Sequence, residues 1–280
     1  MSRLQSKVCI VTGSSSGLGR AIALAFAREG ASLVVCGDVT REPPPAEGET
    51  EGETEGETET ETLATDVLVD QVPGARGMYV QVDVTDPEQV AGLVQNAVQI
   101  GGKVDIFVNN AGCGPSFTKI HDTPETTWDA TINLNLRGPF LGTKSAIQQF
   151  LTQEPDPVSG ARGKIINVAS TAGLRALQSS SAYCASKAAV ISLTQTTALE
   201  YAADKITCNA ICPGFVQTSM TNFLFQNPDV NQFMQKSTPL GLSQSAPEEI
   251  AKAAVFLASN EAAWMTGVAM PVDGGFTVHD

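Results

Sequence analysis

The chain has 280 residues, and 42% of them are hydrophobic, which is enough for a sizeable buried core. Its formal charge of −13 comes mostly from residues 42–62, which hold nine glutamates and no lysine or arginine; without those nine the charge would be −4. The acidic balance and the lack of a basic patch argue against nucleic-acid binding, and no run approaches the roughly 18 apolar residues of a membrane helix. The first residues show no targeting features, so we expect a cytoplasmic protein.

The first predicted element is a short apolar strand over residues 7–12. It is followed by the turn Gly13-Ser-Ser-Ser-Gly17-Leu-Gly19 and by a helix over residues 20–30, with apolar residues on one face and Gly30 as its C-cap. Strand, glycine turn and helix form the context in which backbone amides and a helix N-terminus bind the pyrophosphate of a dinucleotide. The spacing is G-x-x-x-G-x-G, not the commoner G-x-G-x-x-G.

A second strand is predicted at residues 31–36, and a helix near residues 63–72. Between them, the low-complexity insertion 42–62 contains three Glu-Gly-Glu-Thr copies and two Glu-Thr pairs. A segment this polar and like-charged cannot bury enough surface to fold, so we expect a mobile loop. We interpret it as a tolerated surface insertion; an acidic docking tail or a cofactor flap is the alternative.

The rest of the chain alternates between predicted strands and helices. Such alternation predicts a Rossmann-type α/β fold: one doubly wound parallel sheet with helices on both faces, in a single catalytic domain over residues 1–280. Polar residues follow several strands, and ligands of such sheets bind beyond the carboxyl ends of the strands. The further strands are expected at 78–82, 104–109, 164–170, 206–211 and 268–272, and the helices at 85–100, 126–151 (with Gly138-Pro139 interrupting its pattern), 181–201 and 247–258.

Tyr183 and Lys187 lie four residues apart on a predicted helix, so their side chains share a face. A phenol titrates near 10, and acting as a base at neutral pH requires a pKa lowered by roughly 3 units. A cation close to the phenol favours the phenolate and supplies part of that shift. Alone, such a pair is usually a solvated helix face, and its significance depends on the other motifs of the chain.

Taken together, the motifs resemble those of the short-chain dehydrogenase/reductase family, of the compact single-domain kind. They occur in family order and cover almost the whole chain, and the glycine spacing favours redox chemistry over epimerisation. The matching segments are Thr12-Gly13-x-x-x-Gly17-x-Gly19, Asn109-Asn110-Ala111-Gly112, Asn135-Leu-Arg-Gly138, Ser170, Tyr183-x-x-x-Lys187, Pro213-Gly214 and Pro271-Val-Asp273-Gly-Gly275.

The resemblance implies an NAD(P)-dependent oxidoreductase that interconverts an alcohol and a ketone. Tyr183 would exchange a proton with the substrate oxygen, and Ser170 would hydrogen-bond the same oxygen. Lys187 would bind the nicotinamide ribose and lower the pKa of Tyr183. Asn135 would hold a water that relays protons from Lys187 to solvent.

Cofactor preference depends on the end of the second strand, where an acidic side chain binds the adenosine ribose and repels a 2′-phosphate. Gly37 occupies the usual acidic position, and Asp38 stands one residue late. Ser16 stands where many NADP users have a basic residue, so NAD is favoured, while Arg41 leaves NADP open. The full set of cofactor-binding residues implied by the resemblance is Gly13, Ser16, Gly17, Leu18, Gly19, Asp38, Asp83, Val84, Asn110, Tyr183, Lys187, Val216 and Thr218.

Residues 214–240 resemble the substrate lid of the family, and their many Phe and Met residues favour a hydrophobic secondary alcohol or ketone. The alternatives are an NADPH-dependent carbonyl reductase of biosynthetic intermediates and, remotely, a catalytically silent cofactor-binding scaffold. The family resemblance implies a homotetramer or homodimer. The six cysteines form no C-x-x-C pair and the two histidines form no cluster, so we predict free thiols and no metal site, with Cys113 and Cys184 near the active site.

Overall fold

A computed structural model describes residues 2–42, 63–241 and 245–279. In these residues, seven parallel strands form one sheet with the order β3-β2-β1-β4-β5-β6-β7, which confirms the predicted α/β class. The strand order changes direction between β1 and β4. The chain continues from β1 toward β2 and from β4 toward β5, which lie in opposite directions along the sheet. The strands are β1 (Val8–Thr12), β2 (Leu33–Asp38), β3 (Gly77–Gln81), β4 (Ile106–Asn109), β5 (Gly163–Val168), β6 (Ile206–Pro213) and β7 (Ala269–Val272).

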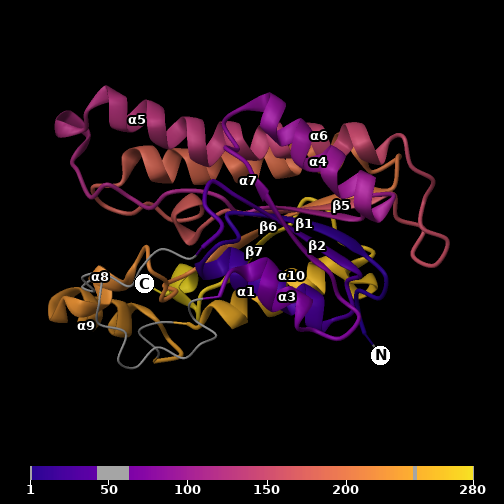
Figure 1. The fold of residues 1–280 in the computed structure, drawn as a ribbon. Helices are drawn as coiled ribbons and strands as arrows, with labels where there is room; N and C mark the ends of the chain where they lie inside the picture. Colours follow the sequence, from indigo (N-terminus) through magenta and orange to yellow (C-terminus); the bar gives the residue numbers. More distant parts are fainter. Residues whose placement is uncertain (1, 43–62, 242–244, 280) are drawn as a thin grey trace.

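The helices form a layer on each face of the sheet (Figure 1). One layer contains α1, α3 and α10, the other contains α4, α6 and α7, and the short helices α8 and α9 lie at one end of the molecule beside the C-terminus. The bounds are α1 (Gly17–Arg28), α3 (Thr65–Asp70), α4 (Pro87–Gly101), α5 (Glu125–Ile132), α6 (Gly138–Phe150), α7 (Ser181–Tyr201), α8 (Asn222–Gln226), α9 (Pro228–Ser237) and α10 (Pro247–Ala258).

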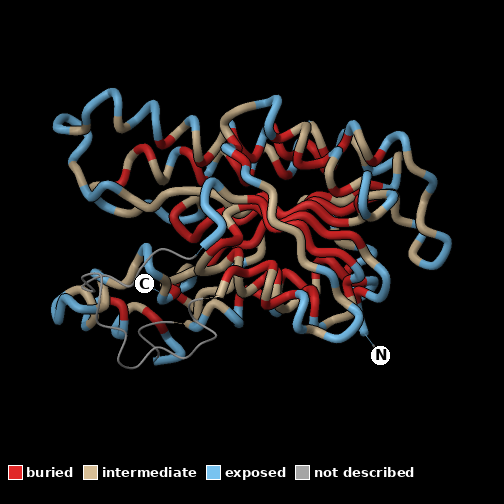
Figure 2. Tube along the Cα trace, viewed as in Figure 1, coloured by how far each residue is buried: buried red, intermediate tan, exposed pale blue. Residues whose placement is uncertain are grey.

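The central strands are buried on both faces, as Figure 2 shows, because successive side chains point to opposite sides of the sheet. In β1, Cys9 and Val11 pack into the core cluster that also contains residues of α1 and α10. Val8 and Ile10 pack into the other cluster, with residues of α4 and α6. This two-sided burial explains why the strands are nearly continuous apolar runs.

The predicted helix over residues 126–151 is the main difference in secondary structure. It consists of α5, a π-helical turn (Asn133–Arg137) and α6, which begins at Gly138 with Pro139 in its first turn. Proline fits a first helical turn, where its missing N–H is not needed. The interruption expected from Gly138-Pro139 is therefore present, and it takes the form of a wider turn just before the pair.

The acidic insertion predicted at 42–62 lies outside the described residues, except for Glu42. On either side of it, Arg41 pairs with Asp66 at 2.7 Å, and the side chain of Arg20 donates to the carbonyl of Leu63 at 2.7 Å. One described end of the insertion is thus held against α3, and the other against α1. None of the described helices is long and apolar enough to cross a bilayer.

Candidate active site

The glycine turn joins β1 to α1 at the carboxyl edge of the sheet, and only glycine fits at its key positions. Gly13 and Gly17 have φ angles of +65° and +53°, in the left-handed region. A Cβ atom at Gly19 would lie 2.0 Å from the carbonyl oxygen of Gly13. The first turn of α1 has no side-chain cap and no acidic residue, so its amides are available to an anion. Leu18 packs against the core below the turn.

Asn110, in the turn after β4, braces the glycine turn. Its side-chain amide donates to the carbonyls of Thr12 at 2.9 Å and Gly13 at 3.0 Å, and its backbone N–H donates to the Thr12 hydroxyl at 3.0 Å. The resemblance implied that Asn110 lies under the adenosine ribose. The geometry places it as a support of the turn on which a dinucleotide would rest.

Asp38 ends β2 with its carboxylate turned toward the glycine turn. The carboxylate accepts hydrogen bonds from the backbone N–H of Ser15 at 2.9 Å and from the Ser15 hydroxyl at 2.7 Å. Gly37 faces the opposite side of the sheet, where a Cβ would lie 3.0 Å from Val82 and 3.1 Å from a methyl group of Leu93. The late position of Asp38 therefore puts the acidic group on the side of the glycine turn.

Asp83 and Val84 follow β3, at the same edge of the sheet. The Asp83 carboxylate accepts from the backbone N–H of Thr85 at 2.9 Å and from the Thr85 hydroxyl at 2.8 Å, so it stabilises the turn that leads to α4. Val84 is buried, and its methyl group lies beside Gly138.

Ser170, Tyr183 and Lys187 come together beyond the end of β5. Ser170 follows that strand, and the other two residues lie in the first two turns of α7. Burial raises the pKa of Tyr183 above its ordinary value, and a hydrogen bond with the Ser170 hydroxyl partly opposes that rise. The Lys187 ammonium lies 5.8 Å from the centre of the Tyr183 ring and donates to the carbonyl of Val168 at 2.9 Å.

The expected lowering of the Tyr183 pKa by Lys187 is wrong for this structure. Desolvation favours the neutral phenol and outweighs the groups that would stabilise the phenolate. Burial also lowers the pKa of Lys187 to about 8, because an ammonium loses hydration inside the protein. The pair therefore consists of a neutral phenol and a lysine ammonium whose pKa is lower than usual.

Asn135 lies in the π-helical turn between α5 and α6 and is fully buried. Its side chain accepts from the backbone N–H of Cys113 at 2.8 Å and donates to the Cys113 carbonyl at 3.0 Å. Gly112 packs between this amide and Lys187, since a Cβ there would lie 2.9 Å from the Asn135 oxygen and 3.6 Å from the Lys187 nitrogen. The π turn, a feature frequent at functional sites, thus brings Asn135 beside the Tyr183–Lys187 pair.

The segment after Pro213-Gly214 passes the glycine turn and leads to α8 and α9. Thr218 lies against the glycine turn, 3.4 Å from a Cβ built at Gly17, and Val216 is buried. The rings of Phe117, in the loop after β4, and Phe223, in α8, meet edge to face with 6.2 Å between their centres. The segment contains two short helices, α8 and α9.

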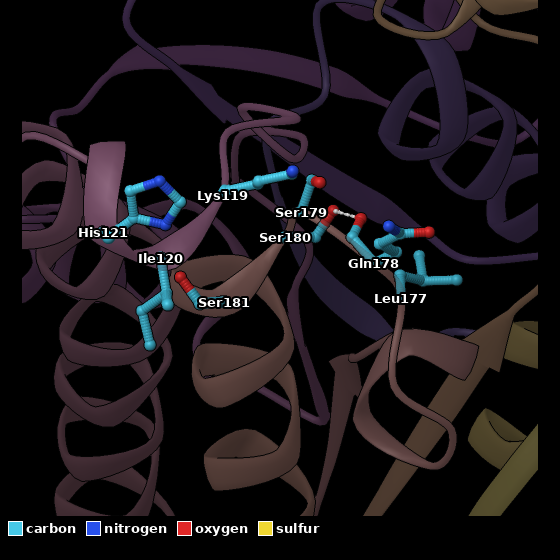
Figure 3. Close-up of a pocket in the computed structure, with 8 residues that line it drawn as sticks. All are labelled: Lys119, Ile120, His121, Leu177, Gln178, Ser179, Ser180 and Ser181. Carbon is cyan, nitrogen blue, oxygen red and sulfur yellow. Dashed lines mark hydrogen bonds between the residues drawn. The ribbon is translucent and has the colours of Figure 1, made fainter.

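A separate recess of about 360 Å³ lies at the start of α7. Figure 3 shows its two walls: Lys119, Ile120 and His121 from the loop after β4, and Leu177 to Ser181 from the loop that leads into the helix. None of the four proposed catalytic residues lines it, so the recess adjoins the catalytic group and is distinct from it. All six cysteines are free, as predicted. In the described part of the chain, no group of His, Cys, Asp and Glu is placed to hold a metal ion.

Several contributors were not predicted from the sequence. Ser15 holds the Asp38 carboxylate, and the Val168 carbonyl holds Lys187. A serine in the glycine turn and a valine at the end of a strand are not distinctive, so nothing in the local sequence could have identified these two contacts. Thr12 and Gly112 were inside recognised motifs, and their packing role is visible only when the loops after β1 and β4 are seen together.

The fold and the site together are those of a dinucleotide-dependent oxidoreductase: a glycine turn at the switch point of a parallel sheet, beside the group of Ser170, Tyr183 and Lys187. The comparisons with known proteins agree. The family model described as "Enoyl-(Acyl carrier protein) reductase" (adh_short_C2) matches residues 13–277. The chain belongs to the short-chain dehydrogenase/reductase family, and it is an NAD(P)-dependent oxidoreductase that acts on CH–OH groups.

The similarity extends over at least 95% of the length of these relatives. The chain is 36% identical over 279 residues to the 3-oxoacyl-[acyl-carrier-protein] reductase FabG of Thermotoga maritima, covering 99% of this chain and 100% of that protein. It is 35% identical to an NAD-dependent glycerol dehydrogenase of Listeria innocua, covering 98% and 95% of the two chains. Among solved structures, a short-chain dehydrogenase/reductase from Mycobacterium marinum superposes with a TM-score of 0.82 at 30% identity, covering 98% and 96%.

Proposed function

We propose that this protein interconverts a hydrophobic secondary alcohol and its ketone, with NAD as the preferred cofactor. The observation that carries the proposal is the convergence of Asn135, Ser170, Tyr183 and Lys187 at one end of the sheet, next to a segment with apolar side chains. The whole chain acts as one catalytic domain in this proposal, and residues 214–240 act as its substrate lid.

The residues fit a dinucleotide, because glycines at positions 13 and 19 let the turn pack tightly where a side chain would clash, and the first turn of α1 presents amides without a side-chain cap. When bound, the cofactor supplies or accepts a hydride at C4 of the nicotinamide. Gly13, Ser16, Gly17 and Gly19 would hold its phosphates. Val216 and Thr218 would orient the nicotinamide end, and Asp83, Val84 and Asn110 would flank the adenosine end.

Tyr183 is the proposed proton donor and acceptor for the substrate oxygen. Its raised pKa keeps the phenol protonated at neutral pH, so it is ready to donate a proton in the reduction of a ketone. Ser170 would hydrogen-bond the same oxygen and stabilise its developing negative charge. Lys187 would hold the ribose hydroxyls, and Asn135 would position the water through which the proton is replaced.

The contacts of Asp38 support NAD over NADP. Its carboxylate is fixed by Ser15 on the cofactor side of β2, where it would repel a 2′-phosphate. Arg41, the basic side chain that the sequence offers to offset this repulsion, is paired with Asp66 at 2.7 Å. A 2′-phosphate would have to compete with that ion pair.

The apolar character of the substrate is inferred from the side chains that border the site. Phe117 and Phe223 pack together, and Met220 lies 3.4 Å from a Cβ built at Gly114. The relatives do not narrow the substrate further, since two of similar identity are named for an acyl-carrier-protein substrate and for glycerol. By family resemblance we also propose a homodimer or homotetramer, which light scattering of the purified protein tests.

The experiment is an absorbance assay of the reduced nicotinamide, with a panel of aliphatic, cyclic and steroidal ketones and alcohols and with each cofactor. Tyr183→Phe should lower turnover at least about a hundredfold while cofactor binding persists, as expected for loss of general acid–base catalysis. Tyr201→Phe, at the other end of α7, is the matched control and should retain turnover. Turnover of Tyr183→Phe within a few-fold of the parent would refute the assignment.

A further inference from the structure

Arg175 connects the turn after Ser170 to the C-terminal segment of the chain. Its backbone N–H donates to the carbonyl of Thr171 at 2.8 Å, which fixes its place five residues after Ser170. Its guanidinium donates to the carbonyls of Phe276 at 3.1 Å and His279 at 2.5 Å. The same guanidinium lies over the Phe276 ring, 5.5 Å from the ring centre. One side chain therefore ties the catalytic serine turn to residues 276–279.

The turn that contains Phe276 is a 3₁₀ helix (Phe276–Val278) stabilised at both ends. At its start, the Asp273 carboxylate accepts from the backbone N–H groups of Gly275 at 2.9 Å and Thr277 at 2.8 Å. At its end, Arg175 satisfies carbonyls that a short helix leaves free. Phe276 is only 4% exposed, so its ring has a fixed position.

That ring supports the base of the lid. Phe276 meets Phe215 edge to face at 4.9 Å between ring centres, and Phe215 meets Phe233 of α9 at 6.5 Å. Edge-to-face pairs at such distances are attractive and directional. Phe215 also directly precedes Val216, which the resemblance places at the nicotinamide end of the cofactor. The contacts run without a gap from the Ser170 turn, through Arg175, Phe276 and Phe215, to the lid helix.

We propose that Arg175 is a positioning residue that sets the place of the lid relative to Ser170 by holding Phe276 under Phe215. The inference rests on the proposed function for its kinetic consequence, because the lid is where the substrate would be enclosed. Loss of the Arg175 contacts frees the 3₁₀ turn, removes the support of Phe215 and lets α9 move away from the site. Substrate binding weakens, whereas the chemical group of Tyr183 and Lys187 remains intact.

The test compares Arg175→Ala with Arg162→Ala in the full chain. Arg162 is a matched control because its guanidinium also donates to two backbone carbonyls, those of Gln153 and Asp204, but before the start of β5, at the opposite edge of the sheet. Arg175→Ala should raise the substrate KM about three- to tenfold and change kcat less than about twofold, as expected when closure of a lid weakens. Arg162→Ala should leave both constants unchanged.

Two further variants separate positioning from general stability. Arg175→Lys should recover part of the KM effect, because an ammonium can donate to the same carbonyls but lacks the planar group that stacks on Phe276. Phe276→Leu should raise KM as Arg175→Ala does, and the double variant should show less than the sum of the two effects, because both act through one contact. Additive effects would contradict the proposal.

Hydrogen exchange of the free protein tests the same idea without turnover. Amides of α9 and of Val216 should exchange about tenfold faster in Arg175→Ala than in the parent, and at the parental rate in Arg162→Ala. Unchanged lid exchange in Arg175→Ala overturns the proposal whatever the substrate is. Faster lid exchange with no activity toward any alcohol or ketone would instead count against the proposed function and leave the role of Arg175 standing.

Discussion

Replacing Lys187 by methionine should make the protein more stable while abolishing its activity. Lys187 is buried, and burial lowers its pKa from 10.5 to about 8, which means that the folded state holds the ammonium at a cost. Its hydrogen bond to the Val168 carbonyl offsets only part of that cost. Methionine has a similar length and no charge, so it removes the cost and keeps most of the packing.

The magnitude follows from the pKa. A lowering from 10.5 to about 8 corresponds to about 3 kcal/mol of unfavourable free energy for the charged form at neutral pH. The variant leaves the Val168 carbonyl without its donor, which costs about 1 kcal/mol, so the net gain is about 2 kcal/mol and several degrees in Tm. Because the folded-state pKa lies below the unfolded value, the parent gains stability as pH rises from about 8 to 10.5, and the variant does not. The advantage of Lys187→Met should therefore disappear near pH 10.5.

The assay is chemical denaturation of parent and variants between about pH 7 and pH 10.5, which spans the folded and unfolded pKa values of Lys187. Lys164→Met is the matched comparison, since burial also lowers the pKa of Lys164 to about 8 and its ammonium donates to the carbonyl of Ser259, at the edge of the sheet away from the site. It should be more stable than the parent at neutral pH, lose that advantage as pH rises toward 10.5, and keep its turnover. A Lys187→Met variant that is less stable than the parent at neutral pH would contradict this account of Lys187, as would a stability difference that does not change with pH.

Three further outcomes are expected. Because burial raises the pKa of Tyr183, alcohol oxidation should accelerate from about pH 7 to about pH 9 in initial-rate assays while ketone reduction does not; an oxidation rate that falls over this range would contradict the role of the phenol. Asp38→Ser should improve kcat/KM for NADP relative to NAD by at least about tenfold, since a like charge facing the 2′-phosphate is removed; a parent that already prefers NADPH would disprove this account of Asp38. Gly37→Asp should destabilise the fold by about 3 kcal/mol or more in thermal unfolding, because its Cβ would lie 3.0 Å from Val82 in the core; an unchanged Tm would mean that the register of β2 is wrong.

Much of the fold could be predicted from the sequence, because local patterns determine it. The strands are apolar runs bounded by turn residues, and α7 was predicted with the ends that it has, residues 181–201. The pairing of Tyr183 with Lys187 could also be predicted, since residues four apart lie on the same face of any α-helix. The π turn around Asn135 could not, because residues 126–151 carry one helical pattern on both sides of it.

The electrostatics of the site were predicted less well, for a physical reason. The sequence shows that a cation stands near the phenol, and proximity alone lowers the phenol pKa. The opposing effect, desolvation, depends on how many groups from distant segments cover the pair, and here it prevails for both Tyr183 and Lys187. The side of the sheet on which Asp38 lies was likewise undetermined, because the motif fixed its position in the chain and not the pleat of β2.

The short turn after β4 explains how the cofactor cradle and the catalytic group keep their relative positions. At its start, Asn110 binds the carbonyls of Thr12 and Gly13 and so fixes the glycine turn. Two residues later, Gly112 packs against Asn135 and Lys187, and the backbone of Cys113 pairs with the Asn135 amide. Each of these hydrogen bonds joins a backbone group to a short asparagine side chain, so few rotatable bonds separate the two halves of the site. Hydride transfer requires such fixed positions, since the nicotinamide and the substrate oxygen must be held in place at the same time.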